Sequence, residues 1–264
     1  MKVVFANVLQ GFVYADVLHK PESMIFKRFS IEEYVEYFVS LDPDLLFISE
    51  LLIENNNGNS EFADELVKKC NFRDYRVLVT EKSWLYVGRM YGMGIFSKYN
   101  LNNYEIFKLP NPKFEVDRPN GEHWILHDKY AQSAKVNVSG LDINIFHLHY
   151  FPLHHFNRKL SDPEMIESRN ALIKYFKNKG KRYPTLVVGD FNNKDESLDV
   201  LFPELFENGW LAESIVTETT LVDGHEQLDH ILYTPIYFDV QEAKAERYLS
   251  DHYSLYVDFN IVMR

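Results

Sequence analysis

Short apolar runs, each bounded by polar or turn-forming residues, recur along the whole chain. Such runs are typical of β-strands, which are buried on both faces where the run is unbroken. The clearest is Leu186-Val-Val188, which leads without a polar break into Gly189. We predict strands at residues 2–8, 45–48, 76–79, 84–87, 94–97, 131–138, 141–149, 186–188, 211–216, 227–233 and 254–261.

Longer segments carry apolar residues at the three- and four-residue spacing of an α-helix. One opens with the capping box Ser30-Ile-Glu-Glu33, and another has Pro163 at its first helical position. We predict helices at residues 30–41, 60–72, 162–176 and 198–206. Together with the strands they predict a mixed α/β fold with many short strands.

An irregular loop is predicted between residues 110 and 121, where three prolines precede Gly121. We regard this loop as a candidate rim of a substrate site. Arg118 and Lys129 are candidates to meet anionic groups there, although charged side chains are more commonly solvated surface positions.

Composition favours one domain that spans residues 1–264. The chain is 46% hydrophobic and 15% aromatic, which is enough for one large core, and no linker, low-complexity tract or charge run divides it. Cys70 is the only cysteine, which excludes an intramolecular disulfide and Cys-ligated metal sites. With no signal-like N-terminal segment and no membrane span, we expect a soluble, cytoplasmic monomer.

The balance of charge limits the partners. With 28 basic and 39 acidic residues, the net charge is -11. A protein of this charge is poorly suited to a large sequence-independent grip on nucleic-acid backbone. A nuclease stays compatible with it, because a bound metal ion can supply positive charge at the scissile phosphate.

Several predicted strands end in polar residues. Asn7 ends the first run, Glu50 closes the run at 45–48, and Asp190 and Asn192 follow Gly189. An ionised glutamate at the end of an apolar strand is costly unless it is paired or bound to a cation. Asp and Asn also form ordinary turns, so each position has a plainer structural reading as well.

Histidines gather near the end of the strand at 141–149. His147 and His149 point to the same face of a strand, and this spacing is a common way to hold zinc. The dinuclear zinc hydrolases that use it need an Asp-His pair two to three residues later, where this chain has Tyr150 and Phe151. One functional or core histidine is the preferred interpretation, and a histidine-bound zinc hydrolase is the alternative.

Two further charged positions lie toward the C-terminus. Asp229 interrupts an apolar strand, and Asp251-His252 precede the last one. A carboxylate beside an imidazole sets its tautomer and pKa, which suits acid/base work. A helix cap or turn is the plainer reading of Asp251-His252.

Seven short motifs follow one another in a fixed order. They are Asn7, Ser-Glu-Leu at 49–51, Gly-Met-Gly-Ile-Phe-Ser-Lys at 92–98, Phe-His-Leu at 146–148, Gly-Asp-Phe-Asn at 189–192, Leu-Asp-His-Ile-Leu at 228–232 and Ser-Asp-His-Tyr at 250–253. This series closely resembles that of the endonuclease/exonuclease/phosphatase superfamily, the DNase I-like and AP-endonuclease-like phosphoesterases. The resemblance covers essentially the whole chain.

The resemblance implies an α+β fold, a four-layer αββα sandwich in which two β-sheets pack face to face with helices outside. It also implies Mg²⁺, with Mn²⁺ as an expected substitute, held by Glu50 with Asn7 and Asp251. Mg²⁺ prefers oxygen ligands of these kinds.

The same resemblance assigns catalytic roles. Asp190 orients or deprotonates the attacking water, and Asn192 holds a phosphate oxygen. His252 contacts the scissile phosphate, His147 stabilises or protonates the leaving group, and Asp229 orients a histidine. The implied function is a Mg²⁺-dependent phosphoester hydrolase, most specifically a phosphodiesterase or nuclease, in which metal and imidazoles offset charge developing around phosphorus.

Two positions depart from the pattern of the resembled family: Ser49 stands where glutamine is usual, and Ser254 where proline is common. Neither removes a catalytic atom. The expected substrate is a nucleic acid or a nucleotide-like diester. Inositol or sugar phosphates, lipid head groups and a non-catalytic binding role on the same fold stay open as alternatives.

Overall fold

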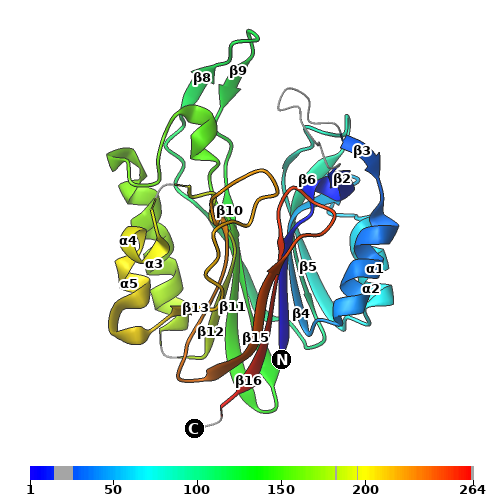
Figure 1. Cartoon of the computed structure of the whole chain (residues 1–264), viewed down its shortest axis with the longest axis vertical. Coiled ribbons are helices and arrows are strands. Elements are labelled where there is room, and N and C mark those ends of the chain that lie inside the picture. The colour runs from blue at the N-terminus through cyan, green and yellow to red at the C-terminus, as the bar shows by residue number, and fades with distance from the viewer. Residues whose placement is uncertain (15–25, 182, 195, 263–264) are drawn as a thin grey trace.

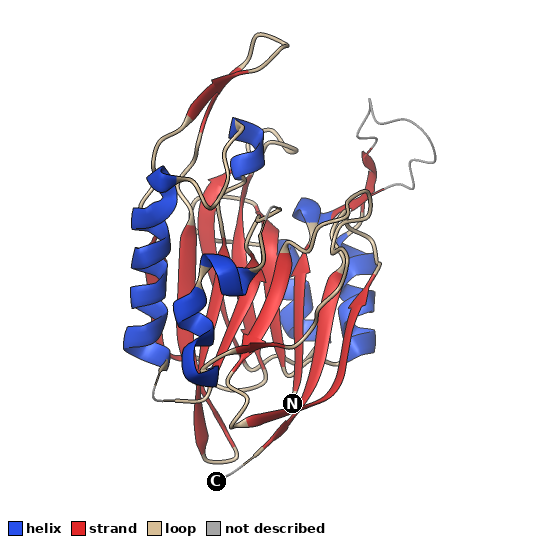
Figure 2. Ribbon diagram, turned by 60° about the vertical axis from the view of Figure 1, so that its left-hand side comes forward, coloured by secondary structure: helices blue, strands red, loops and turns tan. Residues whose placement is uncertain are grey.

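The structure is a computed structural model that describes residues 1–14, 26–181, 183–194 and 196–262. Two β-sheets lie in the middle of the molecule, and helices cover their outer faces (Figure 1). From a second direction the strands again fill the centre, with helices on either side (Figure 2). The predicted four-layer αββα sandwich of the α+β class is confirmed.

The first sheet joins the N-terminal part of the chain to its C-terminal end. Within the described residues its order is β15 (Phe238–Glu246), β16 (Ser254–Ile261), β1 (Lys2–Asn7), β4 (Leu45–Ile53), β6 (Met90–Ser97) and β5 (Asp74–Lys82). At its centre β1 runs parallel to β4, and the neighbouring pairs are antiparallel.

The second sheet is built from the middle of the chain. Its order, within the same described residues, is β13 (Ala212–Glu213), β14 (Asp229–Tyr233), β12 (Thr185–Asp190), β11 (Leu141–His149), β10 (Tyr130–Val138) and β7 (Asn102–Lys108). Here β12 runs parallel to β11, and the neighbouring pairs are again antiparallel.

The two sheets therefore show the same succession of strand directions. In this comparison β1 corresponds to β12, and β4 corresponds to β11. The correspondence agrees with two similar halves packed against each other.

Helices pack on the two outer faces and the sheets pack on each other. The helices are α1 (Ile31–Leu41) and α2 (Glu61–Lys69) beside the first sheet, and α3 (Ile166–Gly180), α4 (Leu198–Leu201) and α5 (Pro203–Phe206) beside the second (Figure 1). Along β1, Val3 and Phe5 pack between the sheets, whereas Val4 and Ala6 pack under the helices. Burial on both faces explains why this strand is an unbroken apolar run.

The predicted helix starts at Ser30 and Ser60 are confirmed in detail, whereas the helix expected from residue 162 opens with the 3-10 turn Pro163–Met165 before α3. Oγ of Ser30 accepts a 3.3 Å hydrogen bond from the backbone N–H of Glu33, and Oγ of Ser60 accepts one of 3.1 Å from Ala63. Each cap satisfies a donor that the first helical turn leaves free. No helix among the described residues is long and apolar enough to span a bilayer.

The shorter elements are mostly at the edge where the sheets open. They are η1 (Leu9–Gly11), β2 (Phe12–Tyr14), β3 (Phe26–Phe29), β8 (Glu115–Asp117), β9 (His123–Ile125), η2 (Leu153–Phe156), η3 (Pro163–Met165) and η4 (Glu207–Gly209). β8 and β9 pair as a hairpin that projects from the body (Figure 1). The prediction of a wholly irregular loop at 110–121 was therefore wrong in part.

Two other strand predictions need correction, and two edge strands were not predicted. Residues 84–87 form bends and a turn, and Val87 is fully exposed, so this apolar stretch joins no sheet. The strand expected at 211–216 is reduced to β13. β7 and β15 were missed because they are edge strands whose residues are largely exposed and polar, which removes the apolar pattern.

Candidate active site

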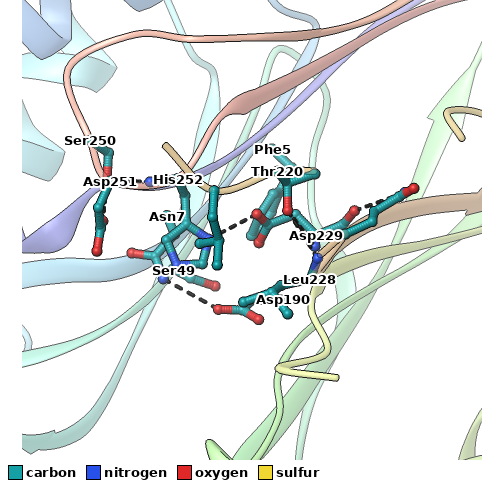
Figure 3. Close-up of polar contacts among 12 residues, drawn as sticks. Phe5, Asn7, Ser49, Asp190, Thr220, Leu228, Asp229, Ser250, Asp251 and His252 are labelled. Atoms are coloured by element: carbon teal, nitrogen blue, oxygen red, sulfur yellow. Dashed lines mark hydrogen bonds and ion pairs between the residues drawn. The ribbon is translucent and has the colours of Figure 1, made fainter. Parts of the chain in front are cut away.

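The central strands of both sheets bring polar residues to one edge of the sandwich. Asn7 ends β1, and Asp190 ends the corresponding strand β12. Nδ2 of Asn7 donates a 3.4 Å hydrogen bond to Oδ2 of Asp190 (Figure 3). A carboxamide from one half thus meets a carboxylate from the other.

Glu50 interrupts the regular pairing of β4. The register with β6 shifts between Ser49 and Leu51, and Glu50 has a φ of 55°, uncommon outside glycine. Its Oε2 is buried and has no hydrogen-bond partner. Burial, and then the charge of Asp251, raise the pKa of Glu50, while Asn7 opposes the shift. A cation would offset both unfavourable effects, so these oxygen donors fit a metal ion.

Asp190 is only 1% exposed. The backbone N–H of Asn192 donates a 2.7 Å hydrogen bond to its Oδ1. Burial, and then the charge of Asp229, raise the pKa of Asp190 to about 7. Gly189 permits this packing, because a Cβ there would lie 2.0 Å from the carbonyl oxygen of Leu148.

Asp229 and His252 form a buried pair. Nδ1 of His252 donates a 2.8 Å hydrogen bond to Oδ2 of Asp229 (Figure 3). Burial alone would lower the pKa of His252, but the charge and hydrogen bond of Asp229 raise it well above its ordinary value. Oγ1 of Thr220 accepts hydrogen bonds from the backbone N–H groups of Leu228 and Asp229, at 2.9 and 3.2 Å. Thr220 thus anchors the strand entrance, a role that no sequence motif indicates.

Acidic and histidine side chains from β12, β14 and the segment before β16 converge at this edge. One ligand atom each from Asp190, Asp229 and His252 lie within 4.8 Å of one another, and the described residues contain no other such group of three acidic, histidine or cysteine side chains. Asp251, on the same loop as His252, is half-buried and accepts a 3.0 Å hydrogen bond from Oγ of Ser250. The alternative of a zinc cluster around the H-x-H motif finds no such group among the described residues.

His147 lies between the sheets, below this edge. It is fully buried, and Phe5 and Phe47 pack edge-on against its ring. Nε2 of Gln132 donates a 3.0 Å hydrogen bond to Nδ1 of His147, so Nε2–H of His147 donates the 3.2 Å bond to Oγ of Ser49. Burial lowers the pKa of His147 to about 3.

His149 lies two residues further along β11, at the edge itself. It is the register partner of Asp190, whereas His147 is the partner of Val188. Nε2 of His149 is 3.6 Å from Oδ2 of Asp190. Burial, and then the charge of Lys129, lower the pKa of His149 well below its ordinary value. The structure thus places His149 beside the carboxylates at this edge. All the predicted site residues lie there as well, except His147, which lies deeper between the sheets.

The β8–β9 hairpin leans on the helix η2. The guanidinium of Arg118 stacks 4.4 Å from the ring centroid of Trp124, and its Nη1 donates a 3.3 Å hydrogen bond to the carbonyl oxygen of His155. Trp124 also packs edge-on against the ring of His155. The guanidinium of Arg118 therefore contacts Trp124 and His155 of the protein itself.

Solved structures share this fold. An endonuclease/exonuclease/phosphatase from Beutenbergia cavernae has 15% identity and a TM-score of 0.71, covering 98% of this chain and 71% of that one. The human Nocturnin catalytic domain with bound sulfate anion has 17% identity and a TM-score of 0.64, over 99% and 94%. A mannosyl-6-phosphatase from Bacteroides thetaiotaomicron has 14% identity and a TM-score of 0.61, over 98% and 99%. At these identities the likeness shows the fold alone.

The sequence itself matches a family model. No curated protein sequence matches the chain significantly. The model of the Endonuclease/Exonuclease/phosphatase family matches residues 25–252, which include five of the seven motifs read from the sequence and all but the last residue of a sixth. With its fold, its motifs and this match in agreement, the chain belongs to the endonuclease/exonuclease/phosphatase family.

Proposed function

We propose that this protein hydrolyses a phosphodiester with a divalent metal ion and water. The observation that carries the proposal is one edge at which the buried Asp229–His252 pair lies near the unpartnered carboxylate oxygen of Glu50. The charge on a phosphoryl group redistributes during attack by water. A protonated imidazole and a cation are the groups best suited to stabilise it.

Glu50, Asn7 and Asp251 are proposed to hold Mg²⁺, with Mn²⁺ as a substitute. Carboxylate and carboxamide oxygens are the ligands that Mg²⁺ prefers. Support comes from Oε2 of Glu50, since a buried charged oxygen without a partner is costly. When bound, the ion polarises phosphoryl oxygens and lowers the pKa of water.

Asp190 is proposed to accept the proton of the attacking water. Its pKa of about 7 lies close to the pH of a cell, where a general base works best. Asn192 is proposed to hold a phosphate oxygen. One N–H of its Nδ2 already donates to the carbonyl of Tyr150 at 3.2 Å, and an amide nitrogen carries a second.

His252 is proposed to donate a hydrogen bond to the scissile phosphate through Nε2. Asp229 occupies Nδ1, which fixes the tautomer and keeps the imidazole protonated. The stabilisation is electrostatic and depends on the pair staying buried.

We assign the leaving-group side to His149 and give His147 a supporting role. Both nitrogens of His147 are already bonded, to Gln132 and to Ser49. Nε2 of His149 lies 3.6 Å from Oδ2 of Asp190, which is too long for a strong hydrogen bond. This nitrogen can therefore turn toward a substrate.

The proposed substrate is a short or single-stranded nucleic acid or a nucleotide-like diester. The net charge of -11 disfavours long duplex DNA, whose binding needs many Lys and Arg contacts. Monoesters of sugars or inositol are the second candidate, since a mannosyl-6-phosphatase shares the fold. We further propose a single-domain monomer of the cytoplasm, where the buried free thiol of Cys70 would stay reduced.

A hydrolysis screen tests the proposal. Purified protein is assayed with Mg²⁺, Mn²⁺ and Zn²⁺ against a simple diester, a monoester, single-stranded DNA, duplex DNA and RNA. We expect diester cleavage with Mg²⁺ or Mn²⁺ and its loss in Asp190→Asn. Turnover of monoesters alone would favour the phosphatase alternative, and cleavage with Zn²⁺ alone would favour a zinc hydrolase.

A further inference from the structure

Lys129 is a buried lysine at the edge where the sheets open. It is only 6% exposed and immediately precedes β10, whose first residue, Tyr130, pairs with His149. Its Nζ lies 6.0 Å from the ring centroid of Tyr91, on β6 of the other sheet. Lys129 therefore lies between the two halves, next to the proposed catalytic groups.

No ion pair of Lys129 with a carboxylate is found among the described residues, and the carboxylate beside it in the chain, that of Asp128, has other partners. Asp128 pairs with Lys108 at 2.5 Å and with Lys113 at 2.8 Å. Buried lysines are almost always paired, because desolvating an ammonium ion is costly. The charge of Lys129 acts on Glu50, but no direct ion pair of Lys129 is found among the described residues, so its ammonium group can also bind an anion from outside the chain.

Glu81 is the other candidate partner, and it too is occupied. Its Oε2 accepts a 2.8 Å hydrogen bond from the hydroxyl of Tyr91, and its Oε1 lies 2.9 Å from Nδ1 of His127. These contacts link the two halves beside Lys129 and keep Glu81 from pairing with its ammonium group.

The surroundings of Lys129 suit an anion. Its positive charge lowers the pKa of Glu50 on one side and contributes to the lowered pKa values of His149 and His155 on the other. The rings of His154 and His155 lie 4.0 Å apart, and Nδ1 of His154 is buried without a partner. The exposed Lys194 adds a second positive charge acting on both rings.

We propose that Lys129, with His154 and His155, binds a second phosphate group of the substrate, next to the scissile phosphoester. This inference rests on the proposed function and narrows the substrate class to compounds with two phosphates, such as a 5′-phosphorylated dinucleotide or a bisphosphorylated sugar or inositol. A charged hydrogen bond to such a group changes affinity by about ten- to a hundredfold.

The test compares two dinucleotides that differ only in a terminal phosphate, TpT and pTpT. Wild-type protein is expected to show a kcat/KM at least about tenfold higher for pTpT. Lys129→Met should reduce this ratio to about one, and Lys129→Arg should restore part of it, because arginine keeps the charge. Lys108→Met, which removes an exposed lysine paired with Asp128, is the matched control and should leave the ratio unchanged. The same kcat/KM ratio is measured for inositol 1,4-bisphosphate and inositol 1-phosphate. A ratio above one that is lost in Lys129→Met would show that the second phosphate belongs to a monoester substrate.

A wild-type ratio near one, or a ratio unchanged in Lys129→Met, would overturn the proposal. Equal losses on TpT and pTpT in Lys129→Met would also overturn it, since Lys129 would then serve the scissile phosphate. If neither dinucleotide is cleaved, the proposed function fails, and the subsite is judged by calorimetry with Asp190→Asn. Tighter binding of pTpT than TpT, lost on adding Lys129→Met, would still support it, and equal or undetectable binding would refute it.

Discussion

Nδ1 of His252 donates a 2.8 Å hydrogen bond to Oδ2 of Asp229, and both residues are buried. Asp229 opens β14 of the second sheet, while His252 precedes β16 of the first. The bond therefore forms only when the two halves of the sandwich are correctly packed. It also keeps the imidazole charged, because Asp229 raises the pKa of His252 against the opposing effect of burial.

Replacing Asp229 with asparagine should separate the effect of its negative charge from that of its size and shape. Asp229→Asn keeps the size of the side chain but removes the charge that holds the proton on His252. We expect kcat/KM at pH 7 to fall about a hundredfold or more, the size typical of losing an acid/base or electrostatic group. Since Asp229 is the main group that raises the pKa of His252, this pKa should fall in the variant, and the alkaline limb of the pH–rate profile should move to lower pH.

Asp239→Asn is the control for this experiment, because Asp239 is exposed on β15, away from the site. Its profile should match that of the wild type. An Asp229→Asn enzyme with an unchanged alkaline limb would show that His252 does not act as a charged group.

Glu50→Gln should weaken the metal site without unfolding the protein. The carboxamide is nearly the same size but lacks the charge that holds a divalent cation. We expect most activity to be lost at limiting Mg²⁺ and partly recovered at high Mg²⁺. Without metal the variant should be at least as stable as the wild type, since the buried charge of Glu50 is removed.

The measurements are activity against Mg²⁺ concentration and thermal unfolding without metal. Glu36→Gln, on the exposed face of α1, controls for the loss of one negative charge. Full activity of Glu50→Gln at limiting Mg²⁺ would contradict the assignment of Glu50 to the metal.

The parts of the fold that the sequence predicts are those with a residue-level pattern. β1 and β12 are buried on both faces, so each carries an unbroken apolar run, and β4 carries two such runs on either side of Ser49-Glu50. β7 and β15 lie at sheet edges and are mostly exposed, so their residues follow no apolar alternation. At 84–87 an apolar stretch predicts a strand that does not form, and most of its apolar residues stay exposed. An apolar run is therefore not sufficient for a strand.

The site was predictable to the extent that strand ends mark it. Asn7, Glu50 and Asp190 each stand at a break in an apolar run, and the structure brings them together. The choice between His147 and His149 depends on register: only the pairing of β11 with β12 places His149 opposite Asp190. Register across a parallel pair is set by long-range packing and leaves no local signal.

His149 is expected to matter for turnover more than His147. His149→Ala should lower kcat about a hundredfold or more while the protein stays folded, because its Nε2 faces Asp190 at the open edge. His147→Ala should instead cost about 2 kcal/mol or more of stability, since Oγ of Ser49 and Nε2 of Gln132 lose their hydrogen bonds to the imidazole in the core.

Turnover and chemical denaturation of both variants, with the exposed His225→Ala as control, provide the comparison. A large loss of kcat in a fully stable His147→Ala protein, with His149→Ala near normal, would return the leaving-group role to His147.

The stability of the protein should depend on pH through His147. Burial lowers its pKa to about 3, against about 6.5 in an unfolded chain. Between these values only the unfolded chain binds the proton, so stability falls as the pH drops below about 6.5 and this effect ends near 3. The expected loss at pH 5.5 relative to pH 7.5 is about 1.4 kcal/mol.

His147→Gln removes the titrating group and tests this expectation. Chemical denaturation of both proteins at the two pH values gives the difference, in which groups common to both cancel. The same pH dependence in both proteins would show that His147 does not titrate on unfolding.

Binding to nucleic acid should depend only weakly on salt. The 28 basic residues are outnumbered by 39 acidic ones, which leaves a net charge of -11 that repels the DNA backbone, and the proposed contacts concentrate on one or two phosphates. Titration of Asp190→Asn with single-stranded and duplex oligonucleotides should give a log–log salt slope of about -2 to -3, and weaker binding to the duplex. A steep slope near -8, with sub-micromolar duplex affinity at physiological salt, would instead require a broad basic face that neither the charge balance nor the described residues suggest.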